Sequence, residues 1–118
     1  YYPEALSVGA VDRQLNPAPF SGGGQSPVAP ITEPDVVGYG VDILSSLERQ
    51  VDGRSVYALA SGTSMAAPYV TGIAALAAAA DPTLQGEKLR QHLLTQALPL
   101  TSARERVGVG LARFVDTF

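Results

Sequence analysis

SGTSMAAP, at residues 61–68, marks the junction between two halves of this 118-residue sequence that differ in composition. Glycine and proline are concentrated mainly before the junction, which is typical of strands joined by tight turns. Alanine and leucine dominate after it, which favours helices. The junction therefore places a serine, Ser64, where a strand gives way to a helix.

The chemistry that Ser64 can support follows from this position. Gly62 permits a backbone geometry that is closed to other residues, and the first N–H groups of a helix have no partner within it. A helix N-terminus carries about half a positive charge, so these groups would stabilise an oxyanion forming beside the Ser64 hydroxyl. Pro68 is tolerated in a first helical turn. The pattern is suited to acyl transfer.

A simpler interpretation assigns no chemistry to these hydroxyl groups. Ser61, Thr63 and Ser64 can each be a helix N-cap, which is the usual role of a serine or threonine ahead of a helix. On spacing alone, capping is the favoured interpretation.

Two helices of different character are expected after the junction. Residues 65–80 carry no charge and are rich in alanine, and a helix that is apolar on all sides is predicted to be buried inside the protein. A membrane span is not expected, because it needs about 20 strongly apolar residues. Residues 83–97 predict an amphipathic helix, capped by Thr83, that covers one face of a sheet. Its apolar side chains recur at helical spacing: Leu84, Leu89, Leu93, Leu94 and Ala97.

Short strands are expected before the junction. Residues 5–11 predict a buried strand, residues 35–46 two short strands, and residues 55–60 another. The proline- and glycine-rich residues 16–30 predict a loop. Strands followed by a buried helix and an amphipathic helix indicate an α/β layer structure within a single domain.

Composition excludes several classes of partner. The net charge is −3 and the basic residues are scattered, so no basic stripe is available to bind nucleic acid. The chain has no cysteine, which excludes disulfides and thiolate metal sites and leaves the redox compartment open.

GTSMAAP at residues 62–68 closely resembles the active-serine signature of the subtilisin family. Four further segments resemble that family in the same order: YPEALSVGAV at 2–11, APFS at 18–21, PDVV at 34–37 and GVGL at 108–111. A match of this extent is much more specific than a single short motif.

The resemblance implies that Ser64 is the nucleophile of a serine endopeptidase, with Gly62, Thr63 and Met65 around the oxyanion and the substrate. It implies a three-layer α/β fold with a mainly parallel sheet and a central helix that starts at the active serine. The substrates would be peptides or proteins, and the location extracellular or periplasmic.

The same resemblance implies that residues 1–118 form the C-terminal part of one catalytic domain. In the family the catalytic aspartate, the histidine and the oxyanion asparagine precede the serine, and none of the three has a counterpart here. The only histidine, His92, follows the serine and is interpreted as an ordinary helix residue. Because triad members act as a unit, the chain alone is expected to be inactive and to need the upstream part of the domain as a partner.

Two residues depart from the family pattern. Tyr69 stands where the family commonly has histidine, and Tyr39 stands where it has proline.

The resemblance also implies a structural calcium ion. The Asp35 carboxylate could bind it together with the backbone carbonyls of Tyr2 and Ala5, although one carboxylate supplies few of the six or more oxygen ligands that calcium needs. The alternative for Asp35 is a turn or a cap.

A non-catalytic function remains as an alternative: a subtilisin-like scaffold or binding module whose serine only caps its helix. Under either hypothesis, a divided parallel sheet would expose strand edges. The isolated chain is therefore expected to be marginally stable and to associate with a partner fragment or with itself.

Overall fold

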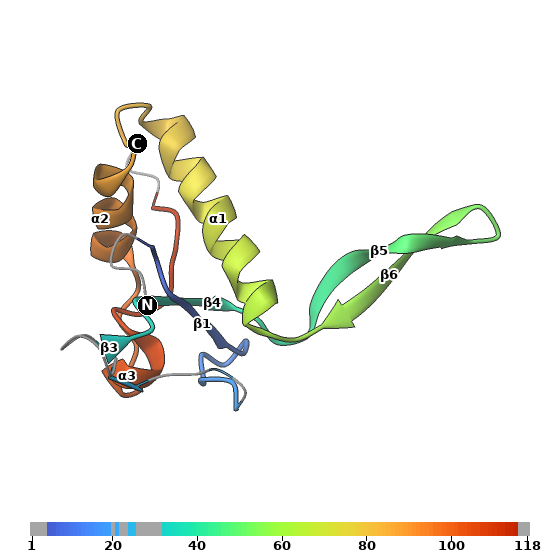
Figure 1. Ribbon diagram of the computed structural model, residues 1–118, viewed down its shortest axis with the longest axis horizontal. Coiled ribbons are helices and arrows are strands. Elements are labelled where there is room, and N and C mark those ends of the chain that lie inside the picture. The colour runs from blue at the N-terminus through green and yellow to red at the C-terminus, as the bar shows by residue number, and fades with distance from the viewer. Residues whose placement is uncertain (1–4, 20, 22–23, 26–31, 116–118) are drawn as a thin grey trace.

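A computed structural model describes residues 5–19, 21, 24–25 and 32–115 of the chain. Its described part measures 52 × 35 × 26 Å along its principal axes. Figure 1 shows a body of strands and helices from which a long two-stranded ribbon projects.

A parallel sheet lies at the centre of the body. Strands β1 (Val8–Val11) and β4 (Val36–Tyr39) pair in parallel. On the other side of β4, the Val37 N–H donates to the Gly110 carbonyl at 2.9 Å and the Ala112 N–H donates to the Val37 carbonyl at 2.9 Å. Strand β4 is therefore hydrogen-bonded on both sides, and the Val37 side chain is fully buried in a cluster with Val11, Val107 and Leu111. The predicted α/β class with a parallel sheet is confirmed.

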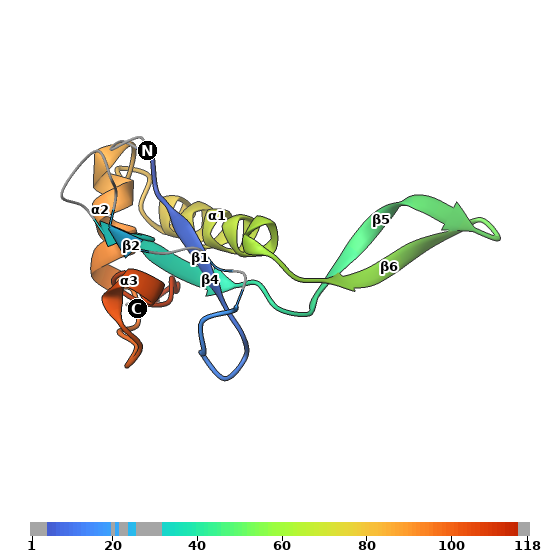
Figure 2. The ribbon, with the colours of Figure 1, turned by 60° about the horizontal axis from the view of Figure 1, so that its bottom comes forward.

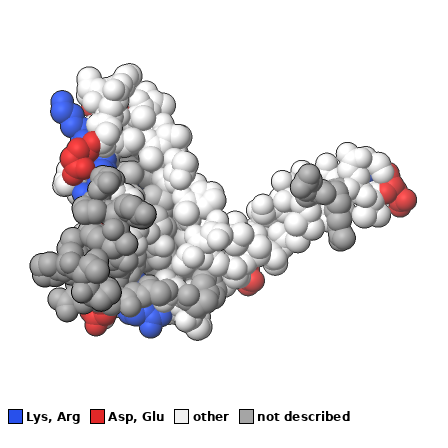
Figure 3. All heavy atoms as spheres, viewed as in Figure 1, with Lys and Arg blue, Asp and Glu red and all other residues white. Residues whose placement is uncertain are grey.

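Helix α1 (Thr63–Ala80) packs across this sheet, against β1 and β4 (Figures 1 and 2). Its buried residues recur every three or four positions and form a single stripe: Ala66, Val70, Ile73 and Ala77. The opposite face is exposed, and Leu76 is 50% accessible. The described elements cover only one face of α1, so burial of this helix on all sides stays a prediction for the assembled domain. Figure 3 shows that the visible surface of α1 carries no charge.

Among the described residues, α1 is also the one helix whose length and composition would permit a membrane crossing. It has 18 residues and a mean hydropathy of 1.3, and 22% of it is buried. Core helices of soluble proteins meet the same criterion, so this is weak evidence. The expectation that the chain has no membrane partner stays a prediction.

Helix α2 (Glu87–Gln96) is shorter than the predicted 83–97. Thr83 does not cap it, because the Thr83 hydroxyl and N–H both donate to the Asp81 carboxylate, at 2.6 and 3.0 Å. These bonds form a separate turn between α1 and α2. The side chain of Leu94 packs against a core cluster that joins β4 and α1, so α2 contributes to the same core.

The remaining elements of the body are short. Strand β1 occupies only the second half of the predicted 5–11. Strands β2 (Gly24–Gln25) and β3 (Thr32–Glu33) form a small antiparallel pair that begins within the predicted loop. Helix α3 (Arg104–Val107) precedes the segment that borders β4.

The ribbon consists of β5 (Ile43–Val51) and β6 (Arg54–Ala60), paired antiparallel. Its turn is Asp52-Gly53, with φ values of 52° and 74°, the left-handed geometry of a tight hairpin turn. The expectation of short, separate strands is wrong here, because an Asp-Gly turn allows the two strands to run on as one continuous hairpin.

Glycines allow α1 to approach the sheet closely. A Cβ at Gly38 would lie 2.8 Å from the Ala66 carbonyl oxygen. A Cβ at Gly40 would lie 2.7 Å from both the Ala10 Cβ and the Gly62 carbonyl oxygen. The start of α1 is therefore in contact with the ends of both central strands.

We predict that Gly40→Ala lowers the free energy of unfolding by about 2 kcal/mol, because the added methyl group overpacks this contact. The matched control is Gly72→Ala, on the open face of α1, where an added Cβ meets no atom within 4 Å. The control raises helix propensity and should stabilise the protein by about 0.5–1 kcal/mol. Denaturant titration measures both changes, and equal effects of the two substitutions would contradict the close contact at Gly40.

Candidate active site

The junction segment is fixed at the carboxyl edge of the central sheet. The Gly62 N–H donates to the Gly40 carbonyl at 2.8 Å, and the Gly40 N–H donates to the Val11 carbonyl at 3.1 Å. Both strands end at this edge, and α1 begins there. Ligand sites of open α/β sheets lie at the carboxyl ends of the strands.

A second contact fixes the segment to the base of the ribbon. The Asp42 N–H donates to the Ser61 Oγ at 2.9 Å. Ser61 therefore anchors β6 to the start of β5 and does not cap α1. The residue at the N-cap position is Gly62, and no side chain caps the helix.

Ser64 lies in the first turn of α1 and is exposed. Among the described residues, no hydrogen bond engages its hydroxyl group, and its N–H has no backbone acceptor. The next two donors are occupied, because the N–H groups of Met65 and Ala66 donate to the Gly62 carbonyl at 3.0 and 3.3 Å. The Ser64 N–H is thus available beside its own hydroxyl at the positive end of the helix.

The other predicted site residues lie around Ser64. Thr63 is exposed on the same turn, and Met65 is half-buried. Gly62 has φ 158° and ψ 165°, and a Cβ at this residue would lie 3.5 Å from the Met65 Sδ. The close contact that supports this segment is at Gly40, where a Cβ would lie 2.7 Å from the Gly62 carbonyl oxygen; Gly40 was not predicted as a site residue from the sequence.

A cavity of about 320 Å³ opens beside the base of the ribbon. Its wall combines three polar residues that follow β1, two residues that precede β5 and one residue of β6: Asp12, Arg13, Gln14, Val41, Asp42 and Leu59. The backbone of Asp42 is the part of this wall that is bonded to Ser61. One residue of the cavity wall is thus hydrogen-bonded to Ser61, three positions before Ser64.

The single histidine lies far from Ser64. The pKa of Asp81 is below its usual value, because Thr83 donates two hydrogen bonds to its carboxylate and, to a smaller extent, because His92 and Lys88 lie nearby. Asp81 follows the last residue of α1. At 1.5 Å per residue, that end of the helix is about 25 Å from Ser64. His92 cannot accept the proton of the Ser64 hydroxyl at this distance.

The Asp35 carboxylate, one of the predicted calcium ligands, faces hydrogen-bond donors of this chain. Tyr2 lies outside the described residues, and Ala5 is exposed. The Ser7 N–H donates to the Asp35 Oδ2 at 2.8 Å, and the Arg90 Nη2 lies 3.9 Å from the Asp35 Oδ1. Both carboxylate oxygens face donors, which does not fit the oxygen-rich shell of calcium. Calcium binding stays a prediction that the described residues do not support.

Tyr39 and Tyr69 form one aromatic pair near the start of α1. Their ring centroids are 5.3 Å apart and their planes are inclined at 83°, an edge-to-face geometry that stabilises aromatic contacts. Burial raises the pKa of Tyr69, and the nearby Tyr39 raises it further. The two residues noted separately in the sequence are therefore in direct contact.

Residues 1–110 match the model of the subtilase family, peptidase S8. The chain belongs to the subtilase family. The subtilisin-like protease PopC of Myxococcus xanthus (strain DK1622) is 46% identical over 114 residues, which make up 96% of this chain and 24% of PopC. Subtilisin Savinase of Lederbergia lenta is 38% identical over 103 residues, which make up 86% of this chain and 33% of that protein.

A solved structure shows the same fold. The CspB protease of Clostridium perfringens superposes with a TM-score of 0.77 at 32% identity, over 93% of this chain and 25% of that one. The chain therefore spans about a quarter to a third of the length of these three proteins. The resemblance inferred from the sequence is confirmed, and so is the subtilisin-like fold.

Two features of this subtilase were not predicted from the sequence: the anchor between Ser61 and Asp42, and the ribbon that begins at Ile43. The ribbon has a sequence signal, because Asp52-Gly53 between apolar runs predicts a two-residue hairpin turn. The anchor has no such sequence signal. The residues around Ser61 do not show that its Oγ accepts a hydrogen bond from the N–H of Asp42, which lies 19 positions earlier in the chain.

We predict that Tyr69→Phe makes this subtilase less sensitive to alkaline pH. The pKa of Tyr69 is raised in the folded state, so the neutral phenol contributes stability that is complete below about pH 10 and is lost as the pH rises through the folded-state pKa. Phenylalanine keeps the ring contact with Tyr39 and cannot ionise. Denaturant titrations on both sides of pH 10 should show a smaller loss for the variant, and equal losses would contradict the assignment.

Proposed function

We propose that this chain supplies the nucleophile, Ser64, of a subtilisin-like serine endopeptidase. The observation that supports the proposal is the position of Ser64, which is exposed in the first turn of α1 and does not cap the helix with its hydroxyl group. The N–H of Ser64 is available beside this hydroxyl group. Membership of the subtilase family supports the same reaction class. The substrates proposed are peptides and proteins, and the location proposed is extracellular or periplasmic.

The proposed reaction has two stages. The Ser64 Oγ attacks the carbonyl carbon of a peptide bond while its proton passes to an imidazole base. The negative charge that develops on the carbonyl oxygen is stabilised by the Ser64 N–H, with Thr63 in support, and by the helix N-terminus. The C–N bond then breaks, the amine leaves with the proton, and water hydrolyses the resulting ester to restore Ser64.

The imidazole base must come from outside residues 1–118. The only histidine of the chain lies near the opposite end of α1. We propose that the upstream part of the same catalytic domain provides the aspartate, the histidine and the oxyanion asparagine. The uncharged, exposed face of α1 (Figure 3) is the surface that this part would cover.

We predict that Ser64→Ala in the full-length protein lowers kcat for peptide hydrolysis by about 10⁴-fold or more, because the nucleophile is removed. The matched control is Thr71→Ala, on the same helix, where the exposed hydroxyl only donates to the Ala67 carbonyl at 3.0 Å. The control should keep kcat within about twofold of the unsubstituted protein.

A fluorophosphonate probe identifies the nucleophile directly. An activated serine oxygen displaces fluoride from the probe and forms a stable ester, which mass spectrometry locates on a peptide. We expect the label on Ser64. A fully folded Ser64 protein that neither takes the label nor hydrolyses peptides would support the non-catalytic scaffold instead.

We predict that residues 1–118, prepared alone, hydrolyse no peptide, and that activity returns when the upstream part of the domain is added. Size-exclusion chromatography with light scattering should show self-association of the isolated chain, because the apolar face of α1 is open. A monodisperse monomer of 12.2 kDa that melts cooperatively would contradict the predicted dependence on a partner.

A further inference from the structure

We propose that Tyr39 and Tyr69 are positioning residues for Ser64, because their contact holds the first turns of α1 at a fixed angle against the end of β4. The proposal rests on the proposed function and adds two residues to it. Neither ring touches the substrate in this proposal. The rings act on the reaction through the helix, so loss of their contact should lower kcat and leave substrate binding largely unchanged.

The start of α1 has little support from within the helix. The residue at the N-cap position, Gly62, has no side chain, and no side-chain hydrogen bond of the described residues caps the helix. Pro68 lies inside α1, four residues after Ser64. Because proline has no N–H, the Ser64 carbonyl lacks the donor that residue i+4 supplies elsewhere in a helix. The position of Ser64 therefore depends on what the next turns of α1 contact.

Two contacts connect this part of the chain to adjacent residues at the end of β4. The Gly62 N–H donates to the Gly40 carbonyl at 2.8 Å. The ring of Tyr69 meets the ring of Tyr39 edge to face, with centroids 5.3 Å apart. From Gly62 to Tyr69 a helix advances about 10 Å at 1.5 Å per residue, and Ser64 lies between the two contacts. One contact alone would let the helix tilt about it, whereas two contacts fix its direction.

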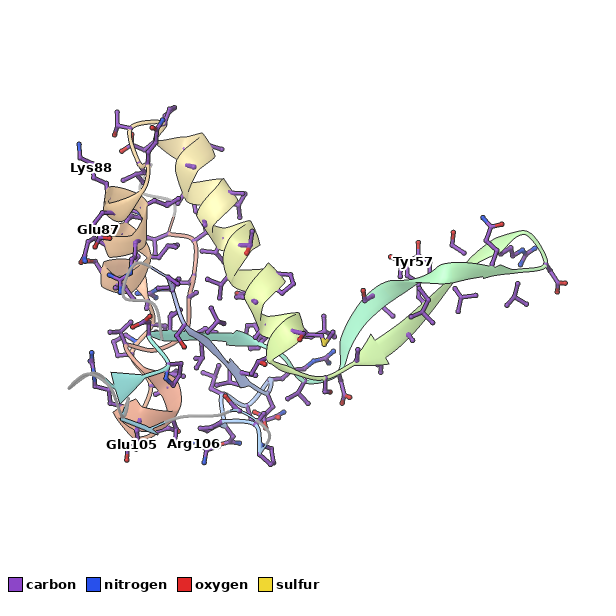
Figure 4. The ribbon with its side chains drawn as sticks, in the orientation of Figure 1. Tyr57, Glu87, Lys88, Glu105 and Arg106 are labelled. Atoms are coloured by element: carbon purple, nitrogen blue, oxygen red, sulfur yellow. The ribbon has the colours of Figure 1, made fainter. Side chains whose placement is uncertain are left out.

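The Tyr69 ring is itself held on both faces of the sheet. It packs against the core cluster that contains Val37 and against the core cluster that contains Val36. Adjacent residues of a strand project to opposite faces, so this one ring joins the packing of both faces. A Cβ at Gly38 would lie 3.1 Å from the Tyr69 Cδ1, so the ring lies close against the strand. Figure 4 shows the side chains that fill the space between α1 and the central strands.

Accurate placement matters most in the step in which the Ser64 Oγ bonds to the carbonyl carbon of the substrate. A misplacement of about 1 Å in such a step can lower the rate by about 10²-fold. Edge-to-face packing is a property of aromatic rings. Leucine at position 69 keeps an apolar side chain there and loses this geometry, so it removes the positioning contact without opening a large cavity.

Steady-state kinetics of the full-length protein test the proposal. The test variant is Tyr69→Leu, and the rescue variant is Tyr69→Phe, which keeps the ring. The matched control is Val107→Ala, which shortens a buried side chain in a cluster that Tyr39 and Tyr69 pack against but belongs to α3. Labelling to completion with a fluorophosphonate counts the reactive serines, so that kcat is expressed per reactive molecule.

We expect Tyr69→Leu to lower kcat about tenfold and to change KM by less than about twofold. Tyr69→Phe should keep kcat within about twofold of the unsubstituted protein. Val107→Ala should lower the midpoint of denaturant unfolding at least as much as Tyr69→Leu does, with kcat again within about twofold. Tyr39→Leu should reproduce the loss of kcat from the strand side. The double variant should lose no more than either single variant, because both remove one contact.

Three results would overturn the proposal. The first is an unchanged kcat in both leucine variants. The second is a fall in kcat for Val107→Ala as large as that for Tyr69→Leu, because general destabilisation would then explain both. The third is multiplied losses in the double variant, which would show that the two rings act separately. If Tyr69→Leu does not fold, Tyr39→Leu decides between these outcomes.

Failure of the proposed function has a different signature. In that case the unsubstituted full-length protein neither hydrolyses peptides nor takes the fluorophosphonate label on Ser64, and the positioning role is overturned with it. A protein that hydrolyses peptides and labels Ser64, with kcat insensitive to both tyrosines, would overturn the positioning role alone.

Discussion

The hydrogen bond from the Gly62 N–H to the Gly40 carbonyl oxygen connects the start of α1 to the end of β4, and the candidate site depends on this connection. At 2.8 Å it brings two backbone segments together where a Cβ at Gly40 would not fit. The helix must therefore begin at the carboxyl edge of the sheet. Ser64 lies in its first turn, where unpaired N–H groups and the helix dipole act on the same point.

This arrangement explains how a short segment can carry the proposed nucleophile. Ser61 is anchored by Asp42, and Ala66 is buried against the sheet. Ser64, which lies between them, has neither constraint and is exposed. A reactive hydroxyl needs this combination, because a rigid support positions the oxygen while an open surface admits the substrate.

The same connection separates two surfaces of different character. On one side of the junction, α1 presents an uncharged helix face that the described elements leave open, and parallel sheets with their helices are normally covered on both sides. On the other side, the ribbon presents Leu44, Tyr57 and Leu59. We assign the first surface to the rest of the catalytic domain, and Ser64 lies between the two surfaces.

The pair formed by Tyr39 and Tyr69 connects the end of β4 to the first turns of α1. Because the two rings are in edge-to-face contact, they act as one packing unit, and substitutions at the two positions are expected to be coupled. The contact supports the helix behind Ser64 without reaching the hydroxyl.

The sequence by itself determined the serine at a strand-to-helix junction, the α/β class, the positions of the two longer helices to within a few residues, and the family. These features depend on local propensity and on short motifs, which are written in consecutive residues. Only the tertiary structure decided which face of α1 is buried and that Asp35 is paired with Ser7 and Arg90. It also decided that His92, in α2, lies near the end of α1 that is far from Ser64. Those outcomes depend on contacts between residues far apart in the chain, and no local pattern of side chains specifies which distant partner will occupy the space.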